Sequence, residues 1–187
     1  MNAAIAKRGR FQLVVIALVF FGPLLLASWM YRTGALMPEG FSNRGALIDP
    51  VVNIGADSAL GKLAAGRWVI LYQDNAECGD NCRAALYRLR QTRQMLGREM
   101  ERVVRVFLHG ESLPDRVFIE GEHPGLQTIN DKGLGDLLEE KRPGNAMPGG
   151  IYLLDPHANL VMYFPPDLDP RDLVDDVRHL LKLSRIG

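Results

Sequence analysis

One uncharged stretch near the N-terminus constrains this chain more than any other feature. Residues 11–30 (FQLVVIALVFFGPLLLASWM) carry no charged side chain, and about 20 apolar residues are enough for a helix to cross a bilayer. Three basic residues stand just before the stretch and one stands just after it. Because basic residues favour the cytoplasmic side, we expect a single-pass anchor over residues 11–32 with residues 1–10 in the cytoplasm.

A cleaved signal peptide is the alternative interpretation of this stretch. The apolar run is longer than the usual core of a signal peptide, and Ala27-Ser28-Trp29 is a poor cleavage site because it ends in a large residue. Both observations favour a retained anchor, with the rest of the chain on the exported side of the membrane.

The remainder has room for one domain of roughly 120 residues. Residues 33–66 mix Gly, Pro, Asn and Asp with short apolar pieces and predict a tether with an irregular lead-in, followed by the domain at residues 67–187. The chain is 47% hydrophobic and 24% charged, which is ordinary for a globular protein. Its formal net charge of zero offers no electrostatic attraction to nucleic acid, so we exclude nucleic acid as a partner.

The first half of the domain shows a strand, a helix and a second strand. Residues 68–72 form a continuous apolar run of the kind that is buried on both faces of a sheet. Apolar residues then recur at helical spacing over residues 80–96, and residues 103–108 are rich in β-branched and aromatic side chains. This order predicts two parallel strands joined by a right-handed crossover.

The second half is less regular. We expect a short strand at residues 117–119, a helix at residues 134–140, and a hairpin of residues 151–154 and 160–164 around a turn-rich connection. A final helix follows, capped by Asp169. The fold class is therefore α/β, a mixed sheet with flanking helices, preceded by one N-terminal transmembrane helix.

The two cysteines, Cys78 and Cys82, are four residues apart, after a buried strand and at the first turn of the predicted helix. Residues four apart share a helix face, so the thiols can approach each other or converge on a metal ion. A helix N-terminus favours the reactive thiolate, and thiolates suit Cu(I) or Zn(II). The exported side also permits a disulfide. A structural bridge over so short a loop would stabilise the fold little, which favours a reactive or metal-binding role.

The loop before the hairpin adds a resemblance to a known superfamily. Residues 146–150 (AMPGG) lead directly into the first hairpin strand. Together with the cysteine-bearing strand–helix turn and the closing helix, this order resembles the thioredoxin superfamily, which carries a cis-proline loop facing its cysteines. The resemblance assigns that place to Pro148.

Within that superfamily, the C-x-x-x-C spacing, the anchor and the segments 152–156 and 163–164 resemble the Sco/SenC family. Its members are membrane-anchored, face the exported side, bind copper through two cysteines and a histidine, and help to assemble the dinuclear copper site of cytochrome c oxidase. The resemblance therefore implies a bacterial inner-membrane protein with a periplasmic domain, Cu(I) as a candidate ligand, and an oxidase subunit or another assembly factor as partner.

The chain departs from the Sco/SenC pattern in two places. The prolines that flank the family's cysteines are missing from residues 78–82, and Met147 stands where we align the family's histidine. A methionine thioether can bind Cu(I), so Met147 is either a third soft ligand beside Cys78 and Cys82 or an apolar neighbour of the cysteines. Each of the four histidines is better interpreted as a surface or packed residue than as a ligand: His109, His123, His157 and His179.

Three functions remain open. The first is a Sco-like assembly factor that acts as a copper carrier or as a thiol reductant, in which Cys78 attacks a partner disulfide and Cys82 resolves the mixed disulfide. The second is a non-catalytic membrane interaction module of the same assembly machinery that has lost metal chemistry. The third is a general periplasmic thiol-disulfide oxidoreductase, which the absence of C-x-x-C spacing disfavours. A classical metabolic enzyme is not expected.

Overall fold

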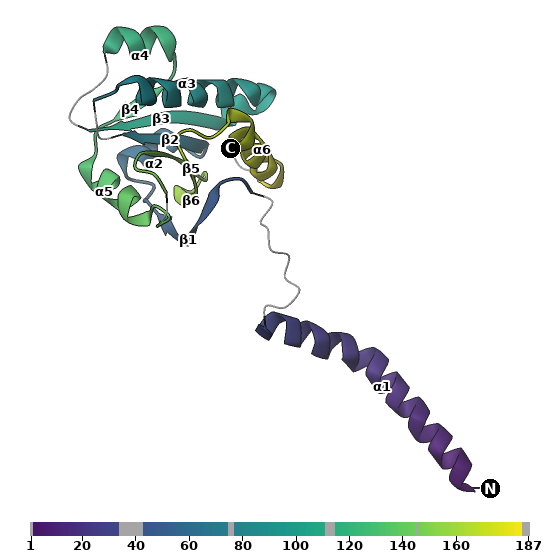
Figure 1. Cartoon of the computed structure of the whole chain (residues 1–187). Helices are drawn as coiled ribbons and strands as arrows, with labels where there is room; N and C mark the ends of the chain where they lie inside the picture. The colour runs from purple at the N-terminus through teal and green to yellow at the C-terminus, as the bar shows by residue number, and fades with distance from the viewer. Residues whose placement is uncertain (1, 34–42, 75–76, 111–114, 145, 185–187) are drawn as a thin grey trace. The chain divides into compact units, whose positions relative to one another are not determined.

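The structure is a computed structural model that describes residues 2–33, 43–74, 77–110, 115–144 and 146–184, with residues 2–11 described by their backbone alone. The chain divides into two compact units, residues 1–42 and 43–187. Both units are visible in Figure 1. The second unit contains residues 67–187 together with residues 43–66, which the sequence predicts as part of the tether and lead-in.

The first unit contains one long helix, α1 (Asn2–Thr33), with Pro23 inside it. Its section Gln12–Thr33 is 22 residues long and has a mean hydropathy of 2.4. The apolar side chains of this section are exposed; Phe20, for example, has 74% of its surface exposed. Length and composition are sufficient to cross a membrane, which agrees with the predicted anchor.

The second unit is a six-stranded sheet with helices on both faces. Its elements, in chain order, are β1 (Ala46–Asn53), α2 (Ala59–Ala64), β2 (Trp68–Asp74), α3 (Asp80–Met95), the 3-10 helix η1 (Gly97–Arg102), β3 (Val103–His109), α4 (Arg116–Glu122), β4 (Gln127–Ile129), α5 (Lys132–Lys141), β5 (Gly150–Leu154), β6 (Asn159–Phe164) and α6 (Pro170–Leu183). The strand order is β1-β6-β5-β2-β3-β4. The strands β2, β3 and β4 are parallel, while β5, β6 and β1 pair antiparallel.

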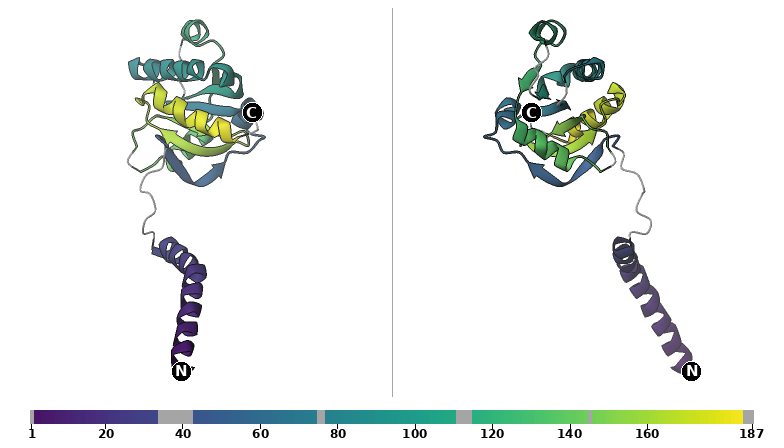
Figure 2. Two further views of the ribbon diagram at one scale, coloured as in Figure 1. Left: turned by 90° about the vertical axis from the view of Figure 1, so that its right-hand side faces the viewer. Right: turned by 60° about the vertical axis from the view of Figure 1, so that its left-hand side comes forward.

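Helices lie on both faces of the sheet (Figure 2), and the sheet separates two apolar cores. On one side α3 and α6 cover the sheet with residues such as Leu86, Leu89 and Val177. On the other side α2 and α5 contribute Leu60 and Leu138. Because β2 and β3 lie between both layers, nearly all of their residues are buried, which explains their continuous apolar runs. The predicted mixed sheet with flanking helices is confirmed.

The lead-in is more regular than its composition predicted. Residues 46–53 form the edge strand β1, which pairs with β6 at the far end of the chain. Ser58 caps the N-terminus of the following α2, and its hydroxyl accepts a hydrogen bond from the Gly61 amide at 3.0 Å. The pairing that makes β1 a strand is therefore long-range, and an edge strand of mixed polarity gives little local signal.

The strand expected at residues 117–119 is wrong, because these residues lie in α4. The Asp115 carboxylate accepts a hydrogen bond from the Val117 amide at 2.9 Å and caps the helix. Phe118 and Ile119 then bury their side chains in the core on the α3 side of the sheet. Burial and capping outweigh the β propensity of the Val-Phe-Ile run. The helix expected at residues 134–140 is confirmed as part of α5.

Candidate functional site

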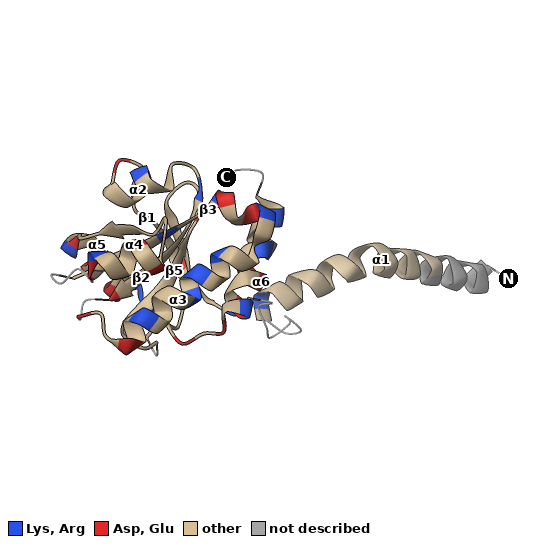
Figure 3. Cartoon of the chain, turned by 90° about the horizontal axis from the view of Figure 1, so that it is seen from above, with Lys and Arg blue, Asp and Glu red and all other residues tan. Residues whose placement is uncertain are grey.

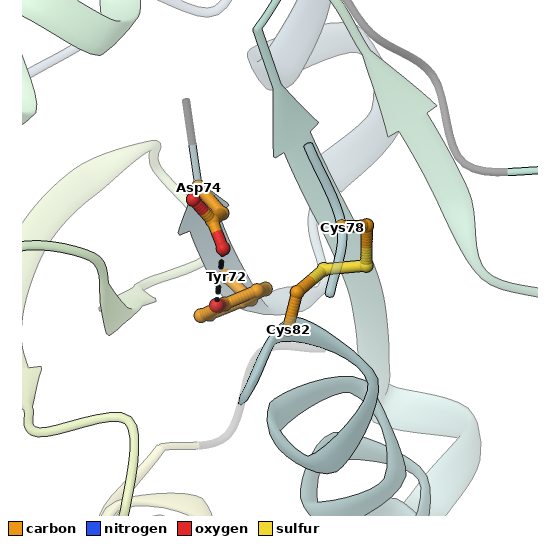
Figure 4. The surroundings of a disulfide bond; sticks show 4 residues. All are labelled: Tyr72, Asp74, Cys78 and Cys82. Carbon is orange, nitrogen blue, oxygen red and sulfur yellow. Dashed lines mark hydrogen bonds between the residues drawn. A yellow bond between two sulfur atoms is a disulfide. The ribbon is translucent and has the colours of Figure 1, made fainter. Parts of the chain in front are cut away.

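The cysteine pair lies at the carboxyl-terminal edge of the parallel strands, where β2 leads into α3. Cys78 precedes the helix, Gly79 is its N-cap, and Cys82 lies in its first turn. The two cysteines form a disulfide with their Cα atoms 5.0 Å apart (Figure 4). Of the states that the sequence left open, the structure shows the disulfide, and it places Cys78 just before the helix rather than on it.

The two sulfur-bearing residues differ in exposure. Cys82 packs in the core between α3 and the sheet and exposes 2% of its surface, whereas Cys78 is only partly buried against the same core. A partner thiol or disulfide can therefore reach Cys78 more readily than Cys82. The rate of thiol–disulfide exchange depends on access to the sulfur, so the two cysteines are not equivalent in such an exchange.

A groove of about 1200 Å³ opens beside Cys82. Its described lining combines five carboxylates with a single guanidinium. The carboxylates are those of Asp74, Glu77, Asp80, Glu139 and Asp167, and the guanidinium is that of Arg88. The disulfide thus lies at the edge of a groove with a predominantly negative lining.

A tyrosine supports the floor of the groove. The Tyr72 hydroxyl donates a hydrogen bond to the Asp74 carboxylate at 3.0 Å, and its ring stacks on Phe107. Burial raises the pKa of Tyr72 above its usual range, and the neighbouring Asp74 raises it further. Tyr72 therefore stays protonated and acts as a donor to Asp74 at all ordinary pH values.

The loop before β5 also reaches this groove. Met147 and Pro148 are part of its lining, and the Met147 side chain is 48% exposed. The Tyr163 hydroxyl donates to the Met147 carbonyl at 3.0 Å and fixes the loop against β6. Among the described residues the cis peptide bond precedes Pro50, so the bond before Pro148 is trans. The loop occupies the place expected for it, but without the expected cis-proline.

The histidines lie elsewhere. His109 ends β3 and contacts the Gly110 carbonyl, His123 is buried against Phe118, and the other two, His157 and His179, are on the surface. In the described ranges, no three His, Cys, Asp or Glu side chains are grouped closely enough to hold a metal ion. Of the three predicted sulfur ligands, Cys82 and Met147 line this groove, and Cys78 is joined to Cys82 by the disulfide.

Sequence reasoning missed three of the polar groove residues, Tyr72, Asp74 and Arg88. A signal for the first two was present, because polar side chains at the carboxyl end of a buried parallel strand commonly face a site. Arg88 carries no such signal. It reaches the groove because its guanidinium donates to the Pro166 carbonyl at 2.9 Å, a contact with the distant β6–α6 connection.

Comparison with solved structures shows similarity to several Sco proteins. Copper-bound ScoI of Arabidopsis thaliana is 21% identical, with a TM-score of 0.51 over 66% of this chain and 89% of that chain. Yeast Sco1 is 19% identical, with a TM-score of 0.51 over 66% of this chain and 84% of that one. Apo Sco1 of Thermus thermophilus is 18% identical, with a TM-score of 0.50 over 64% and 82%. At these identities the similarity establishes the thioredoxin-like fold.

Two family models together match most of the chain. No curated protein matches it. The family model for a transmembrane-like N-terminal domain matches residues 5–34, and the model for a transmembrane-like, thioredoxin-like C-terminal domain matches residues 68–184. The chain therefore belongs to the family of transmembrane-like proteins with a thioredoxin-like C-terminal domain.

Proposed function

We propose that this protein is a Sco-like, membrane-anchored thiol reductant that acts on the copper-site cysteines of cytochrome c oxidase during assembly. The observation that carries the proposal is the disulfide between a buried Cys82 and a more accessible Cys78 beside an open groove. The domain lies on the periplasmic side of the bacterial inner membrane in this proposal. Its partner is the oxidase subunit or an assembly factor that presents it.

The reaction consumes the reduced pair and produces the disulfide. The Cys78 thiolate attacks one sulfur of the partner disulfide, so a mixed disulfide forms and one partner thiolate leaves. The Cys82 thiolate then attacks the Cys78 sulfur and releases the second partner thiolate. Two electrons pass to the partner, and an external dithiol must reduce the Cys78–Cys82 disulfide before the next cycle.

Charges near Cys78 favour electron transfer from the reduced cysteine pair to the partner disulfide. Glu77 and Asp80 lie within two residues of it, and their carboxylates destabilise a thiolate relative to the neutral disulfide. The N-terminus of α3 acts oppositely, but it is equivalent to about half an elementary charge. Both carboxylates are exposed, so the net effect is screened and modest. Its sign favours electron donation by the reduced pair.

The asymmetry of the two cysteines gives the test. We expect the full-length Cys82→Ser variant, reduced and mixed with the oxidised copper-site subunit, to accumulate a mixed disulfide through Cys78. The matched Cys78→Ser variant should accumulate at least tenfold less, because its remaining thiol is buried. Non-reducing gels with mass spectrometry measure both. Equal trapping by the two variants, or normal oxidase activity in cells that carry Cys78→Ala with Cys82→Ala, contradicts the proposal.

Copper transfer is the second candidate, favoured by Met147 in the lining of the groove that contains Cys82. Here Cu(I) is cargo, held by the two thiolates and the thioether of the reduced protein. Anaerobic Cu(I) titration of the reduced full chain against a chelator tests it, with Cys78→Ser and Met147→Leu variants. Binding that both variants lose supports the three-sulfur site. No binding, together with no thiol exchange but retained association with oxidase subunits, supports a non-catalytic interaction module.

A further inference from the structure

A second pocket lies away from the cysteines, at the opposite end of the parallel strands. Because β4 pairs with β3 only at residues 106–108, the start of β3 lacks a second strand neighbour among the described residues. A cavity of about 300 Å³ opens there. It is called the β3-edge pocket here, and four cationic residues line it: Lys62, Arg67, Arg93 and Arg105.

The positive charge of the β3-edge pocket is compensated only in part, by one ion pair and by backbone carbonyls that accept from Arg67 and Arg93. Its described lining contains no Asp or Glu. Arg93 pairs with the largely exposed Glu101 at 3.3 Å, but Lys62 and Arg67 form no ion pair with any residue that the structure describes. Further basic residues of the same chain lie along α3 (Figure 3). The four cations repel one another, and an anion bound in the pocket would reduce that repulsion.

Arg105 provides a second observation, besides the basic lining, that points to a ligand. It is 4% exposed, and its Nη2 donates to the Pro124 carbonyl at 2.6 Å. Its Nε and Nη1 atoms are buried and have no hydrogen-bond partner among the described residues. Burial, and then repulsion by Arg93 and Arg90, lowers the pKa of Arg105 to about 10, which leaves it charged at neutral pH. A buried guanidinium with two of its three nitrogens unpaired is costly.

From these observations we propose that the β3-edge pocket binds a phosphate group. Arginine guanidinium groups and a lysine ammonium are the side chains that bind phosphate oxygens in proteins. The volume accommodates a phosphate group with part of the molecule attached to it. That molecule is either a soluble phosphate compound or an anionic lipid headgroup of the membrane that holds the anchor. The proposal is independent of the cysteine chemistry, because no residue is shared between the two sites.

Thermal unfolding of the full chain in non-ionic detergent tests the soluble source. Inorganic phosphate should raise the Tm above that in chloride of equal ionic strength, because binding to the folded state alone stabilises it. The general stabilising effect of phosphate as a salt acts on all variants equally. The specific increase should therefore be lost in the exposed double variant Lys62→Gln, Arg67→Gln and retained in Arg171→Gln, a surface change outside the pocket. Arg105→Gln should weaken apparent phosphate affinity at least tenfold.

Nanodiscs test the lipid source. If the phosphate belongs to a headgroup, amide hydrogen exchange at residues 59–64 and 103–105 slows when phosphatidylglycerol is added to phosphatidylcholine. The Lys62→Gln, Arg67→Gln variant should not show this slowing, while Arg171→Gln should. An effect confined to inorganic phosphate assigns the soluble source, and an effect confined to nanodiscs assigns the lipid. No effect in either assay, or an equal effect in the double variant, overturns the proposal.

Discussion

At Tyr163, one hydroxyl holds the loop that borders the groove. It donates to the carbonyls of Met147 at 3.0 Å and Gly149 at 3.3 Å. Burial raises the pKa of Tyr163, so this donor is retained at neutral and mildly alkaline pH. Tyr163→Phe should cost about 1 kcal/mol and speed amide exchange at Gly149 and Gly150. Tyr87→Phe, which alters an exposed hydroxyl, is the control, and equal exchange in the two variants would contradict this role.

His123 gives the fold a dependence on acid. It is 1% exposed, and neither ring nitrogen has a hydrogen-bond partner among the described residues. Its pKa is lowered from the usual 6.5, first by burial and then by Arg90 and Arg105, with a smaller opposing effect of Glu122. Below pH 6.5 the imidazole of His123 is therefore protonated more readily in the unfolded chain than in the folded chain.

Because the pKa of His123 is lower in the folded chain, the free energy of unfolding should be highest above pH 6.5 and should decline as the pH falls below it. Urea titrations of the full chain in detergent, from about pH 7.5 to about pH 5, measure the free energy of unfolding. His123→Gln should flatten this part of the profile, whereas the exposed His157→Gln should leave the slope unchanged. An unchanged slope in His123→Gln would refute the assignment.

Among the secondary-structure elements, α6 holds the start of the domain through one buried carboxylate. Asp176 accepts hydrogen bonds from the backbone amides of Arg44 at 2.7 Å and Gly45 at 2.8 Å. Gly45 packs so closely on the ring of Phe164 that a Cβ there would overlap it. The carboxylate therefore fixes the residues that lead into β1.

Loss of this carboxylate should detach the lead-in. Asp176→Ala should lower the free energy of unfolding by about 1.5–3 kcal/mol, the range for hydrogen bonds to a charged group, and speed amide exchange in β1. Asp176→Asn keeps one acceptor and should have a smaller effect. The neighbouring Asp175, which is exposed, supplies the matched control as Asp175→Ala. A loss of equal size in both alanine variants would show that Asp176 has no special role.

Hydrophobic patterns in the sequence predicted the helices and strands whose buried positions follow a regular pattern. The helix expected at residues 80–96 and the two flanking strands are present as α3, β2 and β3, because their periodicity reflects burial on known faces. The patterns failed at α4 and β1. In α4 the cap at Asp115 and the burial of Phe118 outweigh β propensity, and β1 exists through pairing with a strand about 110 positions later.

At the scale of the whole molecule, α1 is long and apolar enough to cross a membrane, and the basic residues before it predict on which side the domain lies. A C-terminal alkaline phosphatase fusion, active only after export, should be active, and a C-terminal β-galactosidase fusion should not. Replacing Lys7, Arg8 and Arg10 with Gln should reduce phosphatase activity, because the charge difference across α1 is then lost. The same changes should leave the chain in the membrane fraction. A phosphatase fusion that is inactive in the parent chain would place the domain in the cytoplasm.

The sequence by itself determined the long apolar helix α1, the crossover of β2, α3 and β3, the hairpin, and the position of Cys78 and Cys82 at a strand–helix turn. Each of these depends on neighbours within one or two turns or strand lengths, so periodicity and spacing are enough. Tertiary structure alone decided which cysteine is buried, that Met147 and Cys82 line the same groove, and that Arg105 lies in a basic pocket. Those features arise from segments far apart in the chain, whose proximity depends on how the helices pack on the sheet.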